Sequence, residues 1–274
     1  MKHKLLALFG LKWNPFLPDV PVEALWRGDK IDHFCWRMES LVRDGGFALV
    51  TGDPGTGKSV SLRILNEHLT NQPDVLSGVL TRPQSNISDF YRELGDLFGV
   101  SLTPHNRWAG YKVLRQTWLT HVESTRYRPV LIADEAQEMP TPVLSELRLL
   151  ASSVFDSRSI LTVVLAGDSR LMSRFRGDEL LPVASRIRCR LNLDYLAPNE
   201  LLDWLHHVLD QAGQPNLMAP DVMSTLTEHA AGNLRVLANM ANDLLAEAVR
   251  RELPQIDQKL YLEVFAAQGK PARA

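Results

Sequence analysis

The chain has 274 residues, 45% of them hydrophobic, and a formal net charge of −2 at pH 7. This length predicts one large domain or two unequal ones, and the composition is sufficient for an ordinary hydrophobic core. The near-neutral charge argues against a protein coated in basic residues, although it is compatible with a local basic patch.

The N-terminus imitates a signal peptide, because basic residues precede a short apolar run over residues 5–11. Lys12 ends this run, no small-x-small cleavage site follows, and no other apolar run approaches the roughly 20 residues of a membrane-spanning helix. The two cysteines, Cys35 and Cys189, lack neighbours at metal-ligand spacing and are expected to be buried reduced thiols. We therefore expect a soluble, cytoplasmic protein without membrane insertion.

Large aromatic residues flank an Asn-Pro turn near the start of the chain: Phe9, Trp13 and Phe16. They could form a wall for an adenine ring or simply pack, and both interpretations remain open. We assign residues 1–19 to an N-terminal linker. A helix is predicted from about Asp29 to Arg43, where two consecutive glycines end it.

A glycine-rich loop follows a predicted strand over 46–51 and precedes a predicted helix over 60–69. It has the pattern Gly-x-x-x-x-Gly-Lys-Ser, in which backbone N–H groups surround phosphate oxygens at a helix N-terminus. Lys58 is expected to reach the β- and γ-phosphates and the Ser59 hydroxyl to bind Mg²⁺. The loop predicts a bound nucleoside triphosphate with Mg²⁺, and the family resemblance described below implies that the nucleotide is ATP. The predicted nucleotide-binding residues are Gly52, Asp53, Pro54, Gly55, Thr56, Gly57, Lys58, Ser59 and Val60.

Strands and helices then alternate, as in an α/β protein with a parallel sheet. The predicted elements are a strand over 75–81, helices over 87–98 and 107–124, a strand from 128, a helix over 140–154 and a strand over 159–166.

Two adjacent carboxylates end the strand that begins at Arg128. Asp134 is expected to hold Mg²⁺ through its water shell, while Glu135 orients and deprotonates the attacking water. The alternative is that Asp134 only caps the following helix and that Glu135 is solvated.

Asp168 follows the end of the next predicted strand. A polar side chain there could contact the γ-phosphate or the attacking water, although a carboxylate would repel the phosphate. Capping of a turn is the alternative, and both remain open.

Arg186 immediately precedes a fifth predicted strand over 187–193, in which apolar and polar residues alternate. It could reach the γ-phosphate of a neighbouring subunit, where an arginine finger raises the rate on the order of 10³- to 10⁵-fold. The alternative is an ion pair within the chain. Arg174 and Arg176 are the fallback candidates for this role.

Helices replace strands from residue 196 onward, with Gly or Pro at each boundary. They are predicted over 198–211, 220–231, 234–252 and 257–267. We assign 20–195 to a nucleotide-binding core with a parallel five-stranded sheet, 196–268 to a four-helix lid and 269–274 to a tail. Arg235 opens the third lid helix, and we expect it to point to the phosphates. As a plain surface residue it would oppose the helix dipole.

Taken together, the phosphate loop, Asp134-Glu135, the polar strand end, Arg186 and Arg235 resemble the AAA+ ATPases over residues 9–267. The resemblance implies an α/β P-loop AAA+ core, a small C-terminal helical lid, and Mg²⁺-dependent ATP hydrolysis in a homo-oligomer whose sites are shared between neighbours. Asp168 departs from the pattern, because such families more often carry an uncharged polar residue there.

Three short segments, 9–16, 134–137 and 232–235, are similar more narrowly to two kinds of AAA+ ATPase. These are the general secretion pathway protein A (ExeA) type and the transposon-encoded TnsC and TniB type. Secretion-type members continue into a membrane span, whereas this chain stops at Ala274 after a polar tail. We therefore expect a transposition regulator that assembles with ATP on duplex DNA and recruits a transposase. A secretion or envelope-assembly ATPase acting on a protein partner is the alternative, and a monomeric nucleotide-gated module is a third possibility.

Candidate DNA contacts lie on the predicted helix before the carboxylate strand, where basic and aromatic residues are interleaved. Lys112 and Arg115 are three residues apart and share a face. Phosphate contacts from many identical subunits would add up and make DNA binding steeply salt-dependent. A solvated helix face with aromatics in the core explains the same pattern. The candidate contacts are Arg107, Lys112 and Arg115, interleaved with Trp108, Tyr111 and Trp118.

Overall fold

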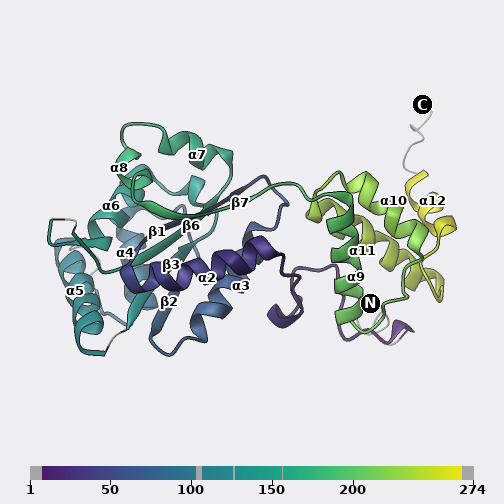
Figure 1. Cartoon of the computed structure of the whole chain (residues 1–274), viewed down its shortest axis with the longest axis horizontal. Coiled ribbons are helices and arrows are strands. Elements are labelled where there is room, and N and C mark those ends of the chain that lie inside the picture. Colours follow the sequence, from purple (N-terminus) through teal and green to yellow (C-terminus); the bar gives the residue numbers. More distant parts are fainter. Residues whose placement is uncertain (1–7, 103–106, 126, 156, 267–274) are drawn as a thin grey trace. The chain divides into compact units, whose positions relative to one another are not determined.

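The computed structural model describes residues 8–102, 107–125, 127–155 and 157–266 (Figure 1). The chain divides into two compact units, each described by itself below. The α/β unit contains residues 27–54 and 58–193. The helical unit contains the residues up to Trp26 and from Asp194 onward, together with Gly55–Gly57. Within the described ranges, no helix is both long and apolar enough to cross a membrane.

A five-stranded parallel sheet forms the centre of the α/β unit, in the order β2-β3-β6-β1-β7, and confirms the predicted fold class (Figure 1). The inner strands β3, β6 and β1 are apolar and buried on both faces, as a parallel sheet covered by helices requires. The edge strand β7 keeps one polar, exposed face. The strands are β1 (Gly46–Gly52), β2 (Val75–Leu80), β3 (Arg128–Ala133), β6 (Thr162–Gly167) and β7 (Ile187–Leu193).

The register of this sheet brings three strand ends to one edge. Ala133 of β3 pairs with Leu165 of β6, and Thr51 of β1 pairs with Gly167 of β6. The residues that follow these strands therefore emerge side by side, at the carboxyl edge where α/β proteins bind ligands.

Helices cover both faces of the sheet (Figure 1). On one face, Phe47, Leu131 and Val163 of the sheet belong to a core that also contains fully buried side chains of α4, α5 and α6. On the other face lie α2 and α3, which contact β1, β3, β6 and β7. The helices are α2 (Asp29–Asp44), α3 (Lys58–Thr70), α4 (Ile87–Leu97), α5 (Arg107–Thr120), α6 (Thr141–Ala151), α7 (Ser169–Phe175) and α8 (Leu181–Ala184).

Two helices of this unit end earlier than predicted. The helix predicted over 107–124 is α-helical only to Thr120 and finishes as a π-helical turn, His121–Thr125. The helix predicted to reach Val154 ends at Ala151, and the chain turns into a short antiparallel pair, β4 (Ser152–Ser153) with β5 (Arg158–Ser159). As a result β6 begins at Thr162, later than the predicted start at residue 159.

Arg115 of α5 explains why α6 stops where it does. Its guanidinium donates hydrogen bonds to the carbonyl oxygens of Leu149 and Leu150, at 2.8 and 3.2 Å, and to that of Ser152. These carbonyls lie in the last turn and just beyond it, where helix carbonyls lack intrahelical partners. A cation at a helix C-terminus also interacts favourably with the helix dipole.

The helical unit is built from α9, α10, α11 and α12, whose boundaries lie within one residue of those predicted. Proline begins α9 and α10, where a missing N–H costs no hydrogen bond. The side chain of Asn233 caps α11 by accepting hydrogen bonds from the amides of Arg235 and Val236. The helices are α9 (Pro198–Gln211), α10 (Pro220–Ala230), α11 (Leu234–Arg251) and α12 (Gln258–Ala266).

The N-terminal segment packs into the core of the helical unit. Phe9 and Phe16 are only 6% and 5% exposed among apolar side chains of the helices α9 to α12. Asn14 donates to Asn242 Oδ1 of α11 at 2.9 Å and accepts from the Phe16 amide at 3.0 Å. Residues 8–26 thus belong to the helical unit. The sequence pattern instead predicts a linker over residues 1–19 and a core that begins at residue 20. Phe9 and Phe16 pack rather than line a surface, which was the second interpretation of this segment.

Phe16→Ala should lower the free energy of unfolding by about 3 kcal/mol, because it leaves a cavity in this core. Urea unfolding followed by circular dichroism measures the change. Leu17→Ala is the matched control: Leu17 is 37% exposed, so it should cost less than about 1 kcal/mol. Equal, small effects of both variants would contradict the packing of this segment.

Candidate nucleotide-binding site

The phosphate loop joins β1 to α3 at the carboxyl edge of the sheet. Gly55 and Gly57 have φ angles of 90° and 100°, which residues with a Cβ rarely adopt. Lys58 begins α3 and is 7% exposed. Its ammonium group donates to the carbonyl oxygens of Gly52 and Asp53, at 2.9 and 3.1 Å. The lysine is therefore folded back over its own loop.

The two predicted metal ligands are in contact. The Ser59 hydroxyl, in the first turn of α3, donates to Asp134 Oδ2 at 2.7 Å. The other oxygen of Asp134 accepts from the Glu135 amide at 2.8 Å. A hydroxyl and a carboxylate oxygen are ligands that fit Mg²⁺, which usually keeps waters and binds substrate phosphates alongside one or two protein groups. In the part of the chain that the structure describes, no group of three or more His, Cys, Asp or Glu is placed to hold a metal ion. The pair Ser59 and Asp134 therefore fits an ion that is also bound by phosphates, rather than an ion held by protein ligands alone.

Glu135 lies at a sharp turn immediately after Asp134. Its φ of 50° and ψ of 40° are left-handed, a conformation that costs roughly 1–2 kcal/mol for a residue with a Cβ. It caps the short 3₁₀ helix η3 (Ala136–Glu138), and its carboxylate accepts a hydrogen bond from the Gln137 side-chain amide. The two adjacent carboxylates thus have different partners, Ser59 for one and Gln137 for the other.

Gln137 is a further residue of this site, and it lies in the segment 134–137 that carries the family resemblance. Its side chain is 7% exposed. Besides donating to Glu135, it accepts from the Asp168 amide at 3.3 Å. The local sequence does not identify this residue, because its burial and its contact with the Asp168 amide arise only when the ends of β3 and β6 are brought together.

Asp168 caps α7. Its Oδ1 accepts from the Arg170 amide at 2.9 Å, and its Oδ2 pairs with the Arg170 guanidinium at 2.8 Å. The hydrogen bond from Arg170 holds the pKa of the Asp168 carboxyl below its ordinary value. The Asp168 carboxylate therefore acts as a helix cap in this structure. Its contact with a γ-phosphate stays a prediction.

The candidate finger arginines are in different situations. Arg174 donates to the Gln137 carbonyl at 2.7 Å and to the Thr141 hydroxyl at 3.0 Å, so it is committed within the chain. Arg176 is exposed at the end of α7. Arg186 is half-buried between α8 and β7 and donates to the Pro182 carbonyl. Burial, and secondarily the charge of Arg148, lowers the pKa of the Arg186 guanidinium.

Arg235 lies exposed in the first turn of α11, where its amide donates to Asn233 Oδ1 at 3.0 Å. The relation of its guanidinium to the phosphates stays a prediction.

The predicted DNA contacts on α5 are only partly available. Lys112 lies over the Trp108 ring, with its Nζ 5.0 Å from the ring centroid, and Trp108 is 63% exposed. Arg115 lies over Tyr111 but also binds the end of α6, as described above. Trp118 is fully buried in the core. The side chain of Arg107 lies outside the described residues. Part of this set of α5 side chains is therefore used for contacts within the chain.

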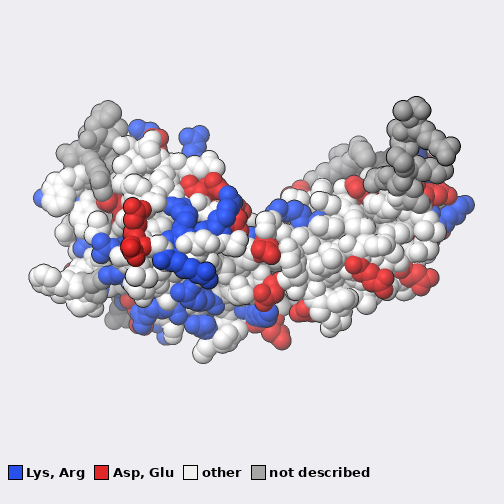
Figure 2. Space-filling model, turned by 90° about the horizontal axis from the view of Figure 1, so that it is seen from above, with Lys and Arg blue, Asp and Glu red and all other residues white. Residues whose placement is uncertain are grey.

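Lys and Arg side chains gather on one face of the α/β unit in Figure 2. Among the exposed residues, Arg188 and Arg190 project from the polar side of the edge strand β7. Arg37 of α2 donates to the Arg188 carbonyl at 3.3 Å, while the Arg188 guanidinium lies 3.6 Å from Asp44. Basic side chains therefore accumulate locally, although the chain as a whole is slightly acidic.

Both cysteines are buried. Burial raises the pKa of the Cys35 thiol to about 11 and also raises that of Cys189. Neither thiol is poised to react, because the thiolate is the nucleophilic form.

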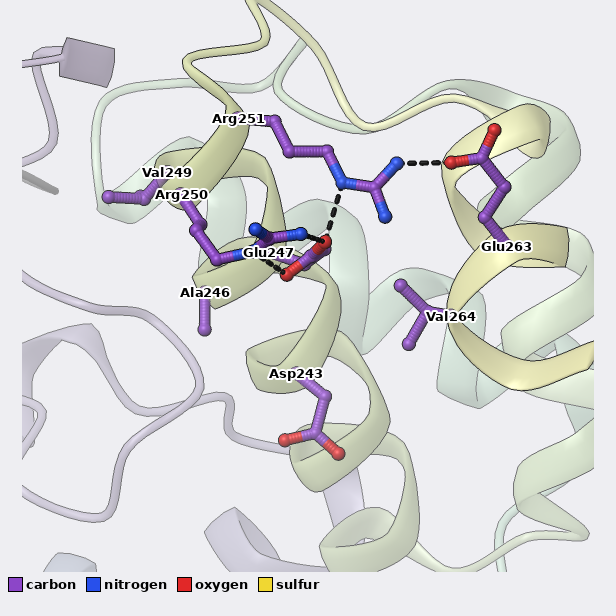
Figure 3. Close-up of a pocket in the computed structure, with 8 residues that line it drawn as sticks. All are labelled: Asp243, Ala246, Glu247, Val249, Arg250, Arg251, Glu263 and Val264. Carbon is purple, nitrogen blue, oxygen red and sulfur yellow. Dashed lines mark hydrogen bonds and ion pairs between the residues drawn. The ribbon is translucent and has the colours of Figure 1, made fainter. Parts of the chain in front are cut away.

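A cavity of about 710 Å³ opens between α11 and α12 of the helical unit (Figure 3). Glu247 accepts hydrogen bonds there from Arg250 and Arg251, and Arg251 also pairs with Glu263. The hydrogen bond from Arg250 contributes most to lowering the pKa of Glu247 to about 2. The arginines of this cavity are already neutralised, so it is a poor site for a triphosphate.

Comparison with known proteins agrees with this fold. Residues 42–175, from before β1 to the end of α7, match the family described as AAA domain. General secretion pathway protein A of Aeromonas hydrophila is 28% identical over 250 residues, 89% of this chain but only 44% of that protein. This chain thus spans less than half the length of that relative.

Solved structures show the same fold at low sequence identity. Cdc6p from Pyrobaculum aerophilum has a TM-score of 0.71 and 15% identity, covering 94% of this chain and 74% of that chain. The Aeropyrum pernix ORC1 protein, solved in complex with DNA, has a TM-score of 0.68 and 18% identity. This match covers 93% of this chain and 68% of that chain. Residues 42–175 thus match the AAA domain family, and the chain has an α/β P-loop AAA+ fold.

Proposed function

We propose that this chain binds ATP together with Mg²⁺ and hydrolyses it. The observation that carries the proposal is the 2.7 Å hydrogen bond between Ser59 and Asp134, which unites the two expected magnesium ligands beside the phosphate loop. The backbone N–H groups of residues 52–60, apart from Pro54, which has none, and the Lys58 ammonium would hold the phosphates. Mg²⁺, when bound by Ser59 and Asp134, would neutralise charge on the β- and γ-phosphates.

Glu135 is the proposed general base for the attacking water. The water oxygen bonds to the γ-phosphorus, its proton passes to the Glu135 carboxylate, and the bond from phosphorus to the β–γ bridging oxygen breaks, leaving ADP and inorganic phosphate. Asp168 fits a supporting role better than direct phosphate contact, because both of its oxygens already accept hydrogen bonds from Arg170.

A neighbouring subunit is proposed to complete the site in a homo-oligomer. Arg186 precedes the edge strand β7, and its half-buried guanidinium is the proposed finger for the next subunit's γ-phosphate. Arg235 is the proposed sensor that links nucleotide state to the position of the helical unit.

The ATPase assignment is tested by separating binding from hydrolysis. Lys58→Ala should abolish ATP binding, because the charge that offsets the phosphates is removed. Glu135→Gln should bind ATP like the parent but lose hydrolysis on the order of 10²-fold or more, because only proton transfer is removed. Fluorescent-nucleotide binding and phosphate release measure the two steps.

Glu138→Gln is the matched control, since it neutralises a carboxylate in the same turn whose ion-pair partner is the exposed Arg170, at 2.9 Å. It should hydrolyse ATP at nearly the parent rate. If Glu135→Gln also kept the parent rate, Glu135 would not be the base.

The finger proposal is tested by mixing subunits. Arg186→Ala alone should lower hydrolysis on the order of 10³-fold. An equal mixture of Arg186→Ala with Lys58→Ala should recover activity at about a quarter of the interfaces, where an intact loop meets an intact arginine. Mixing Arg186→Ala with the Lys58→Ala/Arg186→Ala double variant should recover nothing. Equal results from the two mixtures would rule out a finger acting between subunits.

For the biological process, we propose that ATP drives assembly on duplex DNA and that the assembly regulates transposition by recruiting a transposase. Support comes from the resemblance of the segments 9–16, 134–137 and 232–235 to TnsC- and TniB-type ATPases, and from the basic face in Figure 2. A relative of the same fold was also solved in complex with DNA. The second candidate is a secretion or envelope-assembly ATPase that acts on a protein partner, which the 28% identity to general secretion pathway protein A supports.

Electron microscopy and ATPase rates with and without duplex DNA distinguish the two candidates. The DNA proposal predicts ATP-dependent rings or filaments at low salt, and a steep loss of DNA affinity as salt rises. Lys112→Ala should weaken DNA binding and reduce the salt slope by about one per subunit, whereas Lys259→Ala, the same charge change on exposed α12, should not. No assembly with ATP and DNA, but activation by membrane fractions, would favour the secretion candidate.

A further inference from the structure

Gln137 connects two strand ends of the candidate site. Its side-chain amide donates to the Glu135 carboxylate at the end of β3 and accepts from the Asp168 amide beyond the end of β6, at 3.3 Å. At 7% exposure, the side chain has little access to solvent. Both of its hydrogen bonds are partly buried, although Glu135 itself is exposed.

The chemistry of the two partners determines the orientation of this amide. A backbone N–H only donates, so the amide oxygen must face Asp168. An ionised carboxylate only accepts, so the amide nitrogen must face Glu135. Among the side chains, glutamine has the reach and the paired donor and acceptor for this bridge, whereas glutamate would place two carboxylates together and methionine would leave both partners unpaired.

Gly167 provides the room for the bridge. A Cβ at this position would lie 2.7 Å from Gln137 Oε1 and 2.7 Å from Leu171 Cδ2. The φ of Gly167 is not left-handed, so the backbone itself does not require glycine. Glycine is required because the Gln137 amide and Leu171 approach the Cα of this residue too closely for a Cβ to fit.

Arg174 holds the same turn from α7. Its guanidinium donates to the Gln137 carbonyl at 2.7 Å and to the Thr141 hydroxyl at 3.0 Å. Asp168, whose amide binds the glutamine side chain, caps the other end of α7. The backbone and side chain of Gln137 are thus both tied to one short helix.

We infer that Gln137 is a positioning residue that holds the Glu135 carboxylate where it can take the proton of the attacking water, and that it couples this carboxylate to α7. This inference rests on the proposed ATP hydrolysis. Gln137 takes no proton itself, because its amide remains neutral and keeps both hydrogen bonds. Loss of the bridge should slow proton transfer while leaving the phosphate loop and the magnesium ligands intact.

The test is a double-mutant cycle with Gln137→Met and Glu135→Gln in the full chain. Gln137→Met keeps the size of the side chain but removes both hydrogen bonds. It should lower kcat on the order of 10- to 100-fold, as misplacement of a catalytic group does, and leave KM and ATP affinity within about twofold. In the Glu135→Gln background it should cause no further loss, because it acts through the base that is already missing.

Gly167→Ala provides a second route to the same effect, because its Cβ displaces the amide while every polar group remains. It should also lower kcat without changing ATP affinity, and thermal unfolding shows whether each variant is folded. The control Glu138→Gln should retain the parent kcat.

The outcomes separate the inference from the proposed function. If Glu135→Gln stalls while Gln137→Met and Gly167→Ala turn over like the parent, the inference about Gln137 is wrong and the hydrolytic proposal stands. An additive loss in the double variant, or a rise in KM, would make Gln137 a structural residue. If Glu135→Gln itself hydrolyses ATP at the parent rate, both proposals are overturned.

Discussion

The hydrogen bond from Ser59 to Asp134 joins residues that are 75 positions apart in the chain, and the candidate site depends on it. It can form because β1, β6 and β3 are adjacent and parallel, so that their carboxyl ends meet at one edge. A helix that begins with Lys58 and Ser59 then presents a hydroxyl to the carboxylate that ends β3. Antiparallel pairing of any of these strands would send one of the groups to the opposite edge.

Around this contact, each of the neighbouring carboxylates has a different hydrogen-bond or ion-pair partner. Asp134 is bound to Ser59, Glu135 to Gln137, and Asp168 to Arg170. Each negative charge has a donor of its own, which removes much of the repulsion that three carboxylates near one sheet edge would otherwise experience. The left-handed backbone of Glu135 is the strained point of the arrangement, and strain of this kind tends to occur at functional sites.

In the helical unit, an N-terminal segment and the helices from Pro198 onward share one core. Residues 8–26 and the helices from Pro198 onward bury a common set of apolar side chains, and Asn14 and Asn242 join them by a hydrogen bond. The segment that precedes the α/β unit in the sequence therefore packs with the helices that follow the α/β unit in the sequence.

Much of this protein follows from local sequence. The strand and helix positions follow from hydrophobic periodicity and from Gly and Pro boundaries, and the phosphate loop follows from its spacing, because each of these signals lies within a few consecutive residues. Asp134 and Glu135 are recognisable for the same reason. The end of α6 was misplaced because its determinant, Arg115, lies on another helix.

Contacts between segments that are distant in the sequence determine the features that local patterns do not predict. Examples are the strand order, the burial of Phe9 and Phe16 against the helices α9 to α12, and the hydrogen bond from Arg174 to the turn after β3. In each case the contacting residues are far apart in the sequence, and nothing in their local sequence indicates the contact. Gln137 is the clearest case. Its neighbours in sequence suggest a solvated turn, and its function emerges only when Gly167 and Asp168 are brought against it, because a side-chain amide acquires a role from the donor and acceptor that the fold places on its two sides.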